Sequence, residues 1–379
     1  MLHALFAIAH AGYIAEIGDE FVMAPNGTFH RSAPNGPDGW LFFIGTGGSY
    51  KAAETDNDHS WDRGNPDNFH DLMEREDIID RGITRCPDGT WLYAGSGTQT
   101  IANDSGYLFK ASADLVKTNE ATVDEGATDR VHNDMALVCA KVWSGVIYNQ
   151  SQAGYGFEVD PDGNITGEVV FDGAPGMMGG GILALDDAEE LLLFGQAHSN
   201  GAEVAWARYD ADQQFVDSGE TTLINDFPGK VFWPQGVLRV GDIYALAFMA
   251  REHDSDIKVG EGDVWVALLD SNLELLESAQ LTAFRGTGKG SMRPGISRRG
   301  DTLVISYDVQ VEPRLTEVKL NLDAFDIPGD SADPSGWGDS GDDGGGIPPI
   351  RACGCGLGAS SGGSALGLAA LVLWGRRRR

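Results

Sequence analysis

Residues 263–282, DVWVALLDSNLELLESAQLT, hold an apolar segment, a short polar turn and a second segment in which apolar and polar residues alternate. The first segment, from Val264 to Leu269, is rich in β-branched, aromatic and large aliphatic side chains. Asp270, Ser271 and Asn272 are residues that favour tight turns. The stretch therefore predicts two β-strands joined by a hairpin.

The same hairpin recurs along the chain. Similar pairs of strands begin at Gly106, Gly154 and Glu203, and an aspartate falls at each turn (Asp114, Asp162, Asp210 and Asp270). A polar turn with one more apolar strand precedes most of these hairpins, in residues 38–48, 88–97, 144–152, 188–196, 241–249 and 300–308. The spacing of about 45–60 residues indicates a repeated supersecondary unit.

Units of four strands, repeated about six times, are typical of a β-propeller, and the 52 glycines fit the many turns of an all-β chain. The last unit ends near Phe325 without an outermost strand, and residues 12–22 have no place in the first unit. We therefore predict an all-β, six-bladed propeller over residues 12–325, closed by pairing of residues 12–22 with residues 316–322. Five or seven blades, or a pair of β-sandwiches, are the alternatives.

The composition excludes some function classes. The 27 basic and 57 acidic side chains give a formal net charge of −30, which argues against a nucleic-acid partner. The sequence holds no phosphate loop, Rossmann fingerprint, hydrolase elbow or HExxH pattern, so we predict no cofactor and no metal centre. A hairpin turn explains residues 160–168 more simply than a calcium loop does, and calcium binding by these acidic residues is the alternative.

Two of the four cysteines fall in the body of the chain. Cys86 and Cys139 occupy matching positions, on what we expect to be the innermost strands of consecutive blades. An exported protein would allow them to form a disulfide; two buried free thiols are the alternative.

Both ends of the chain point to export. Residues 1–11 read as a short signal peptide ending in a small-x-small cleavage site, or alternatively as a buried first strand. Residues 326–349 form an acidic Gly/Ser/Pro linker expected not to fold. Residues 350–379 then contain Cys353-Gly354-Cys355, an apolar segment and four terminal arginines.

This tail resembles the MYXO-CTERM sorting tail of myxobacteria and related delta-proteobacteria. The resemblance covers roughly the last 30 residues and rests on the order of linker, cysteines, apolar segment and arginines. It implies export, cleavage near Cys353 and Cys355 by a dedicated membrane protease, and display on the cell surface at the outer membrane. An ordinary tail-anchored helix is the alternative.

The candidate site lies where the segments between blades approach the propeller axis. These segments contribute several arginines on a very acidic chain, together with aromatic and amide side chains: Arg31, Arg81, His132, Asp134, Trp233, Gln235 and Arg293. Arginines in such a ring could hold a carboxylate or a phosphate bidentately. Alternatively, they pair with neighbouring aspartates and only fill the channel.

The chain lacks a clear catalytic set. The segment PDGTWLYAGSG resembles strands of sialidases and of five-bladed arabinanase-like glycosidases, but "TRCPDGTW" (residues 84–91) departs from the Asp-box that a sialidase would have. A glycosidase needs two placed carboxylates, and Asp134 is the one acid that we expect near the axis. We therefore predict a ligand-binding propeller, with glycan or protein as the ligand. A glycosidase or lyase using Asp134, with Asp58 or Asp62 as the partner acid, is the alternative.

Overall fold

The computed structural model describes residues 12–325 except for 24–27, 35–38, 47–48, 57–68, 75–80, 87, 97–105, 124–136, 138–145, 149–153, 174–175, 186–189, 198–200, 253–261, 285–286, 288 and 311. For some strand residues, Arg31 and Trp233 among them, it describes the backbone and not the side chain. The chain divides into two units, Met1–Gly341 and Asp342–Arg379, and every described residue belongs to the first.

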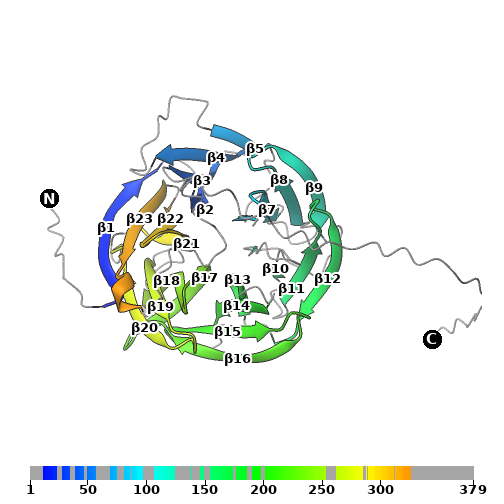
Figure 1. The fold of residues 1–379 in the computed structure, drawn as a ribbon. Helices are drawn as coiled ribbons and strands as arrows, with labels where there is room; N and C mark the ends of the chain where they lie inside the picture. Colours follow the sequence, from blue (N-terminus) through cyan, green and yellow to red (C-terminus); the bar gives the residue numbers. More distant parts are fainter. Residues whose placement is uncertain are drawn as a thin grey trace, which may run out of the picture. The chain divides into compact units, whose positions relative to one another are not determined.

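The described residues form six antiparallel sheets arranged around a central axis, as the prediction of a six-bladed propeller requires (Figure 1). Blade 1 contains β2 (Thr28–Pro34), β3 (Gly39–Thr46), β4 (Ser49–Asp56) and β5 (Phe69–Glu74). Blade 2 contains β6 (Arg81–Arg85), β7 (Trp91–Ser96), β8 (Gly106–Ala111) and β9 (Lys117–Val123). Blade 3 contains, among the described residues, β10 (Val146–Tyr148), β11 (Gly154–Val159) and β12 (Ile165–Phe171).

The second half of the ring follows the same order. Blade 4 contains β13 (Gly176–Leu185), β14 (Glu190–Gln196), β15 (Glu203–Tyr209) and β16 (Phe215–Thr222). Blade 5 contains β17 (Gly229–Val240), β18 (Ile243–Glu252), β19 (Asp263–Leu269) and β20 (Leu275–Gln280). Blade 6 contains β21 (Ser291–Arg299), β22 (Thr302–Val309), β23 (Glu312–Leu320) and β1 (Ile14–Val22), and a 3-10 turn, η3 (Leu322–Ala324), follows β23.

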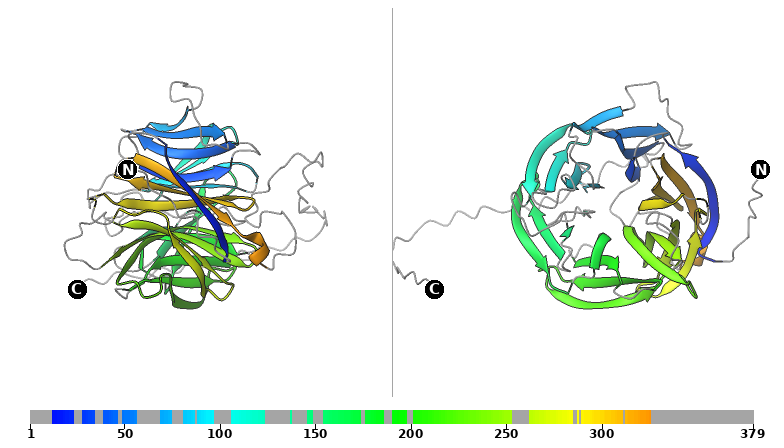
Figure 2. Two further views of the ribbon diagram at one scale, coloured as in Figure 1. Left: turned by 90° about the vertical axis from the view of Figure 1, so that its left-hand side faces the viewer. Right: turned by 180° about the vertical axis from the view of Figure 1, so that it is seen from behind.

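Blade 6 closes the ring with strands from both ends of the described chain. β1 pairs with β23 in antiparallel register, from Ile14 opposite Leu320 to Val22 opposite Arg314. In Figure 2, β1 runs along the rim of the ring beside the last strand. The predicted closure is therefore confirmed, and residues from Ile14 to Leu320 are joined into one ring.

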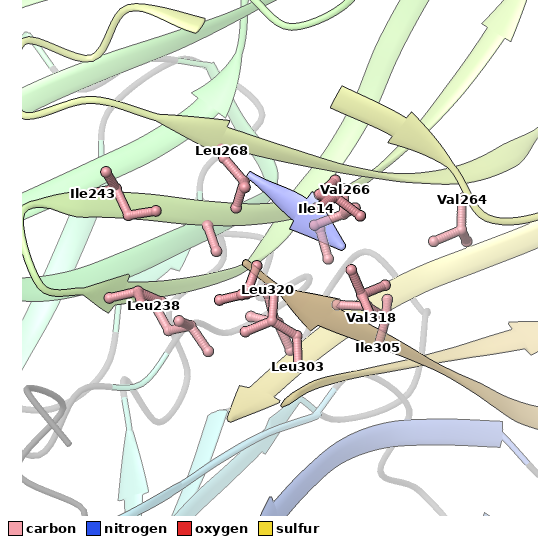
Figure 3. Close-up of a cluster of buried hydrophobic side chains, with 14 of the residues drawn as sticks. Ile14, Leu238, Ile243, Val264, Val266, Leu268, Leu303, Ile305, Val318 and Leu320 are labelled. Carbon is pink, nitrogen blue, oxygen red and sulfur yellow. The ribbon is translucent and has the colours of Figure 1, made fainter. Parts of the chain in front are cut away.

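The core lies between the blades, where neighbouring sheets pack face to face. Its largest cluster joins blades 5 and 6, with Val266 and Leu268 from β19 against Leu303 and Ile305 from β22 (Figure 3). Every residue of β18 from Ile243 to Ala250 is buried, because the middle strands of a blade have neighbours on both faces. The outermost β16 instead alternates between exposed and less exposed residues.

Polar contacts also join consecutive blades. Thr221 on β16 donates a hydrogen bond to the carbonyl of Leu273 in the outer hairpin of blade 5, at 2.7 Å. Asn119 on β9 donates in the same way to the carbonyl of Asp162 in the outer hairpin of blade 3, at 3.0 Å.

Within the described residues, no helix is long and apolar enough to span a membrane.

Candidate functional site

The candidate site is built on irregularities of the innermost strands. In β17, Phe232 lies opposite Met249 and Gly236 lies opposite Ala247, so three residues of β17 face the single Phe248. In β21, Met292 lies opposite Asp308 and Gly295 opposite Ser306, which leaves two residues facing Tyr307. Both irregularities are β-bulges, which redirect side chains and are common next to functional sites.

Two further innermost strands are irregular in their first halves. β2 has one extra residue, His30, between Phe29 and Arg31. β13 is irregular between Gly176 and Gly181. The described strand β6 pairs with β7 without such a break. The innermost strands β2, β13, β17 and β21 therefore each carry a bulge in their first half.

Proline and glycine explain the bulges of β17 and β21. Pro234 and Pro294 are both buried and have no N–H group to donate to a ladder, so each is compatible with a bulge rather than a regular pair. Gly236 follows the first bulge, and a Cβ there would lie 3.0 Å from the backbone nitrogen of Ile296 on β21. The backbones of blades 5 and 6 thus touch beside the two bulges.

Four of the seven sequence-predicted site residues fall in or directly after these bulges, in three consecutive blades. Trp233 and Gln235 lie in the bulge of β17, Arg293 lies in that of β21, and Arg31 directly follows that of β2. Contacts join β17 to β21 and β21 to β2, so these backbone positions are brought to neighbouring strands. Arg81 begins β6, opposite Gly95. His132, Asp134, Cys353 and Cys355 lie outside the described residues.

One part of the sequence-based interpretation needs correction. The segments that carry these residues were expected to be connections between blades, but the structure assigns Thr28–Pro34, Arg81–Arg85 and most of the others to the innermost strands themselves. Their polar composition suggested loops because bulges interrupt the alternation that normally marks a strand.

Sequence reasoning missed Asp308. It is fully buried in β22, lies opposite Met292, and comes after the apolar and hydroxyl-bearing residues 302–307 of the same strand. Ser306, two residues earlier, is also buried, and its hydroxyl has no hydrogen-bond partner among the described residues. Ser291, at the start of β21, donates through its hydroxyl to the carbonyl of Gly262 at 3.0 Å. Buried polar groups therefore gather beside the bulge that carries Arg293. No sequence signal separates Asp308 from the aspartates of exposed turns.

Asp263 organises the connection between blades 5 and 6. Its Oδ1 accepts hydrogen bonds from Thr282 Oγ1 at 3.0 Å and from the backbone N–H of Phe284 at 2.6 Å. Its Oδ2 accepts one from Gln280 Nε2 at 3.1 Å. Burial raises the pKa of Asp263 above its ordinary value, although these hydrogen bonds act in the opposite direction. The carboxylate holds the chain leaving β20 in place.

The repeated aspartates of the outer hairpins have a structural role. Asp210 Oδ1 accepts hydrogen bonds from the N–H groups of Asp212 and Gln214, and Asp270 does the same for Asn272 and Glu274. In blades 2 and 3 the equivalent positions are Ser112 and Asp160, two residues before the aspartates singled out from the sequence.

Residues 160–168, the stretch that resembled part of a calcium loop, contain the turn of the outer hairpin of blade 3. Hydrogen bonds from the side chain and N–H of Asn164 lower the pKa of Asp160. Among the described residues, no group of three or more His, Cys, Asp or Glu side chains is arranged to hold a metal ion.

Cys86 directly follows β6 and is disulfide-bonded. Its predicted partner, Cys139, lies outside the described residues. Leu137 packs in the same buried cluster as Cys86, Leu92 and Phe157, which brings the chain to within two residues of Cys139. The pairing of Cys86 with Cys139 stays a prediction that this packing favours.

Comparison with known proteins places the fold but not the activity. No family model and no curated protein matches the chain. A protein of unknown function from Dyadobacter fermentans is similar in structure, with a TM-score of 0.57 and 11% identity, over 81% of this chain and 99% of the other. A triple arginine-to-alanine mutant of AofleA from Arthrobotrys oligospora matches with a TM-score of 0.53 and 9% identity, over 83% of this chain and 90% of the other.

The chain is a six-bladed β-propeller. A subtype N10 neuraminidase-like protein of A/little yellow-shouldered bat/Guatemala/060/2010 has a TM-score of 0.48 and 11% identity, over 80% of this chain and 96% of the other. At such identities the similarity concerns the fold alone, and the function has to be argued from the residues of the propeller itself.

Proposed function

We propose that this propeller binds a ligand, glycan or protein, at the bulged ends of its innermost strands, without chemical turnover. The observation that carries the proposal is the coincidence of the bulges with the candidate residues. Trp233 and Gln235 lie in one bulge, Arg293 lies in the next, and all three come from neighbouring innermost strands.

The residue types suit recognition. A guanidinium offers paired N–H donors to a carboxylate or phosphate, and an indole provides a flat apolar face for a sugar ring or an aromatic side chain. A bulge costs a strand part of its ladder, so its repetition at matching places in several blades supports a role for the residues it presents.

A glycosidase or lyase is the second candidate, and Asp308 is the observation that favours it. This buried carboxylate lies beside the bulge of Arg293 and would supply one acid, with Asp134 as the other. Glycoside hydrolysis requires two carboxyl groups at a defined separation across the substrate.

The test is a glycan-array and hydrolysis screen of the full chain. We expect specific binding without products, and we expect Trp233→Ala and Arg293→Ala to weaken it by about tenfold or more each. Lys319→Gln, which removes one exposed charge from β23, is the matched control. If the wild type releases products and Asp308→Asn abolishes their release, the enzymatic function replaces the binding function. A screen in which no glycan binds would exclude a glycan as the ligand.

We further propose that the chain is exported and displayed at the outer membrane, with no nucleic-acid partner. The signal-like residues 1–11 and the tail at residues 350–379 support this, as does the formal net charge of −30. Mass spectrometry of the native surface protein should find a chain that ends near Cys353 to Cys355. A surface form that retains Arg379 would contradict cleavage of the tail.

A further inference from the structure

Blade 5 presents two cations around one aromatic ring. The Lys230 Nζ lies 5.6 Å and the Arg251 Cζ lies 5.3 Å from the centre of the Phe232 ring. Lys230 on β17 is directly opposite Arg251 on β18, and all three side chains are partly exposed. The sheet therefore holds two positive charges side by side, within reach of solvent.

The pairing of Lys230 with Arg251 is electrostatically unfavourable unless a negative charge compensates it. Like charges opposite one another on paired strands destabilise a sheet, and contact with a ring face offsets only part of that repulsion. Neither cation has a carboxylate within ion-pair distance in the described part of the chain. In contrast, Arg208 and Arg314 each pair with an acid.

The scarcity of basic residues makes the pair more informative. The sequence has 57 acidic side chains against 27 basic ones, so an average cation has many potential partners. Two adjacent cations without a carboxylate partner are what a site for an external anion requires.

The pair lies next to the proposed ligand site. Phe232 is the last regularly paired residue before the bulge of β17, and Trp233 and Gln235 follow within that bulge. Arg251 is near the end of β18, on the strand adjacent to the bulge. A ligand that contacts the bulge is therefore close to both cations.

We infer that Lys230 and Arg251 form an anion-binding subsite, and that the ligand of this propeller is an acidic oligosaccharide carrying a carboxylate or a sulfate. Arg251 supplies paired donors and Lys230 a compact charge, while Phe232 fixes the position of both. Sugar rings suit the indole of Trp233, the residue after Phe232 in β17, which an inorganic anion or an acidic peptide without aromatic side chains would leave unused. The identity of the ligand rests on the proposed binding function, whereas the anion subsite does not.

The first experiment tests the anion subsite without any glycan. The side-chain ¹⁵Nε–¹H signal of Arg251, assigned by its loss in Arg251→Gln, is followed while sulfate replaces chloride at constant ionic strength. We expect a saturable shift of this signal in the wild type, and a much weaker one in Lys230→Gln. The same signal unmoved by sulfate would overturn the subsite.

The second experiment tests the ligand class by calorimetry on the full chain. The probes are an oligogalacturonate, its methyl ester of equal length, and a sulfated oligosaccharide. We expect the wild type to bind one of the acidic probes about tenfold or more tightly than the neutral ester. The ester has no charged carboxylate to accept hydrogen bonds from Arg251 and Lys230. Arg251→Gln and Lys230→Gln should remove this preference, while the control Lys319→Gln keeps it.

The outcomes separate the two proposals. Equal affinity for acidic and neutral probes, or a preference that survives both substitutions, overturns the acidic ligand. A sulfate response at Arg251 with no binding of any oligosaccharide keeps the subsite and rejects the glycan. An oligoglutamate peptide serves as a fourth probe. Binding of this peptide but of no oligosaccharide overturns the assignment to a glycan in favour of a protein ligand.

Discussion

Glu20 on the first strand of the ring accepts a hydrogen bond from the hydroxyl of Tyr307 at 2.9 Å, although the two residues are 287 positions apart in the sequence. The Tyr307 hydroxyl also lies 2.8 Å from the hydroxyl of Thr316, and Glu20 pairs with Arg314 on β23. Burial raises the pKa of Tyr307, so the phenol remains protonated and keeps donating over the ordinary pH range. This group fastens β1 to the last blade.

Replacing Glu20 by alanine should weaken the closure of the ring. The buried Tyr307 and the largely buried Arg314 side chain would both lose an acceptor, and we expect the free energy of unfolding to fall by roughly 1–3 kcal/mol. Equilibrium denaturation in urea measures this change. Glu16→Ala on the same strand is the control. The Glu16 carboxylate lies at an exposed position, with its Oε2 3.7 Å from the Nζ of the exposed Lys319. An equal loss in both variants would show that Glu20 has no special role in closure.

The fold was more predictable than the site, and β1, the strand that carries Glu20, illustrates the reason. An N-terminal strand without a place in its own unit, and a last unit without its outer strand, can be recognised from the pattern of apolar residues, and the pairing of Ile14 with Leu320 bears this out. Alternation also located most of the other strands. Alternation fails, however, where a bulge changes which face a residue occupies, so the polar segments that begin the innermost strands read as loops.

Cross-strand neighbours and buried polar groups lay beyond sequence reasoning for a related reason. Lys230 and Arg251 are 21 residues apart in the sequence, and only the register of β17 with β18 places them opposite one another. Similarly, nothing in the sequence distinguishes the buried Asp308 from the many aspartates that cap exposed turns. Register and burial, which depend on the whole ring, determine both.

A methyl group at Gly236 should disturb the contact between blades 5 and 6. A Cβ at this position would lie 3.0 Å from the nitrogen of Ile296 and 3.1 Å from the carbonyl carbon of Gly295, both of which are backbone atoms that move little. We expect Gly236→Ala to lower the free energy of unfolding by about 1–3 kcal/mol, as overpacking does. Ligand affinity should fall with it, because the displaced backbone adjoins both bulges.

Gly18 provides the matched control for this substitution. A Cβ at Gly18 would meet the carbonyl oxygen of Glu317 at 3.4 Å, which is ordinary contact. Thermal unfolding of Gly18→Ala should therefore resemble that of the wild type. If both alanine variants unfold like the wild type, the backbones of β17 and β21 are less constrained at the bulges than described.

The stability of the propeller should carry a pH dependence that is specific to Asp263. Its pKa is raised in the folded state, so the folded protein binds this proton more tightly than the unfolded chain does. The contribution of Asp263 to stability is then greatest below its ordinary pKa of 3.8 and is lost as the pH rises through the folded-state pKa.

Asp263→Asn isolates this effect from the other acidic groups. The stability of the wild type minus that of the variant, measured by urea denaturation, should decrease as the pH rises from about 3 to about 7. The remaining carboxylates titrate in both proteins and cancel in the difference. A difference that increases with pH would mean that the hydrogen bonds from Thr282 and Phe284 outweigh the burial of the carboxylate.

The disulfide of Cys86 should join blades 2 and 3. Peptide mapping without reduction is expected to recover one linked pair, Cys86 with Cys139, because Leu137 already packs against the cluster that contains Cys86. A bridge that closes a loop of about 50 residues should contribute roughly 2–4 kcal/mol, so reduction should lower the unfolding temperature markedly. The double variant Cys86→Ser with Cys139→Ser should reproduce that loss and become insensitive to reductant. Serine at Cys353 and Cys355 should leave the unfolding temperature unchanged, and a linked peptide that joins Cys86 to either of those residues would overturn the assignment of its partner.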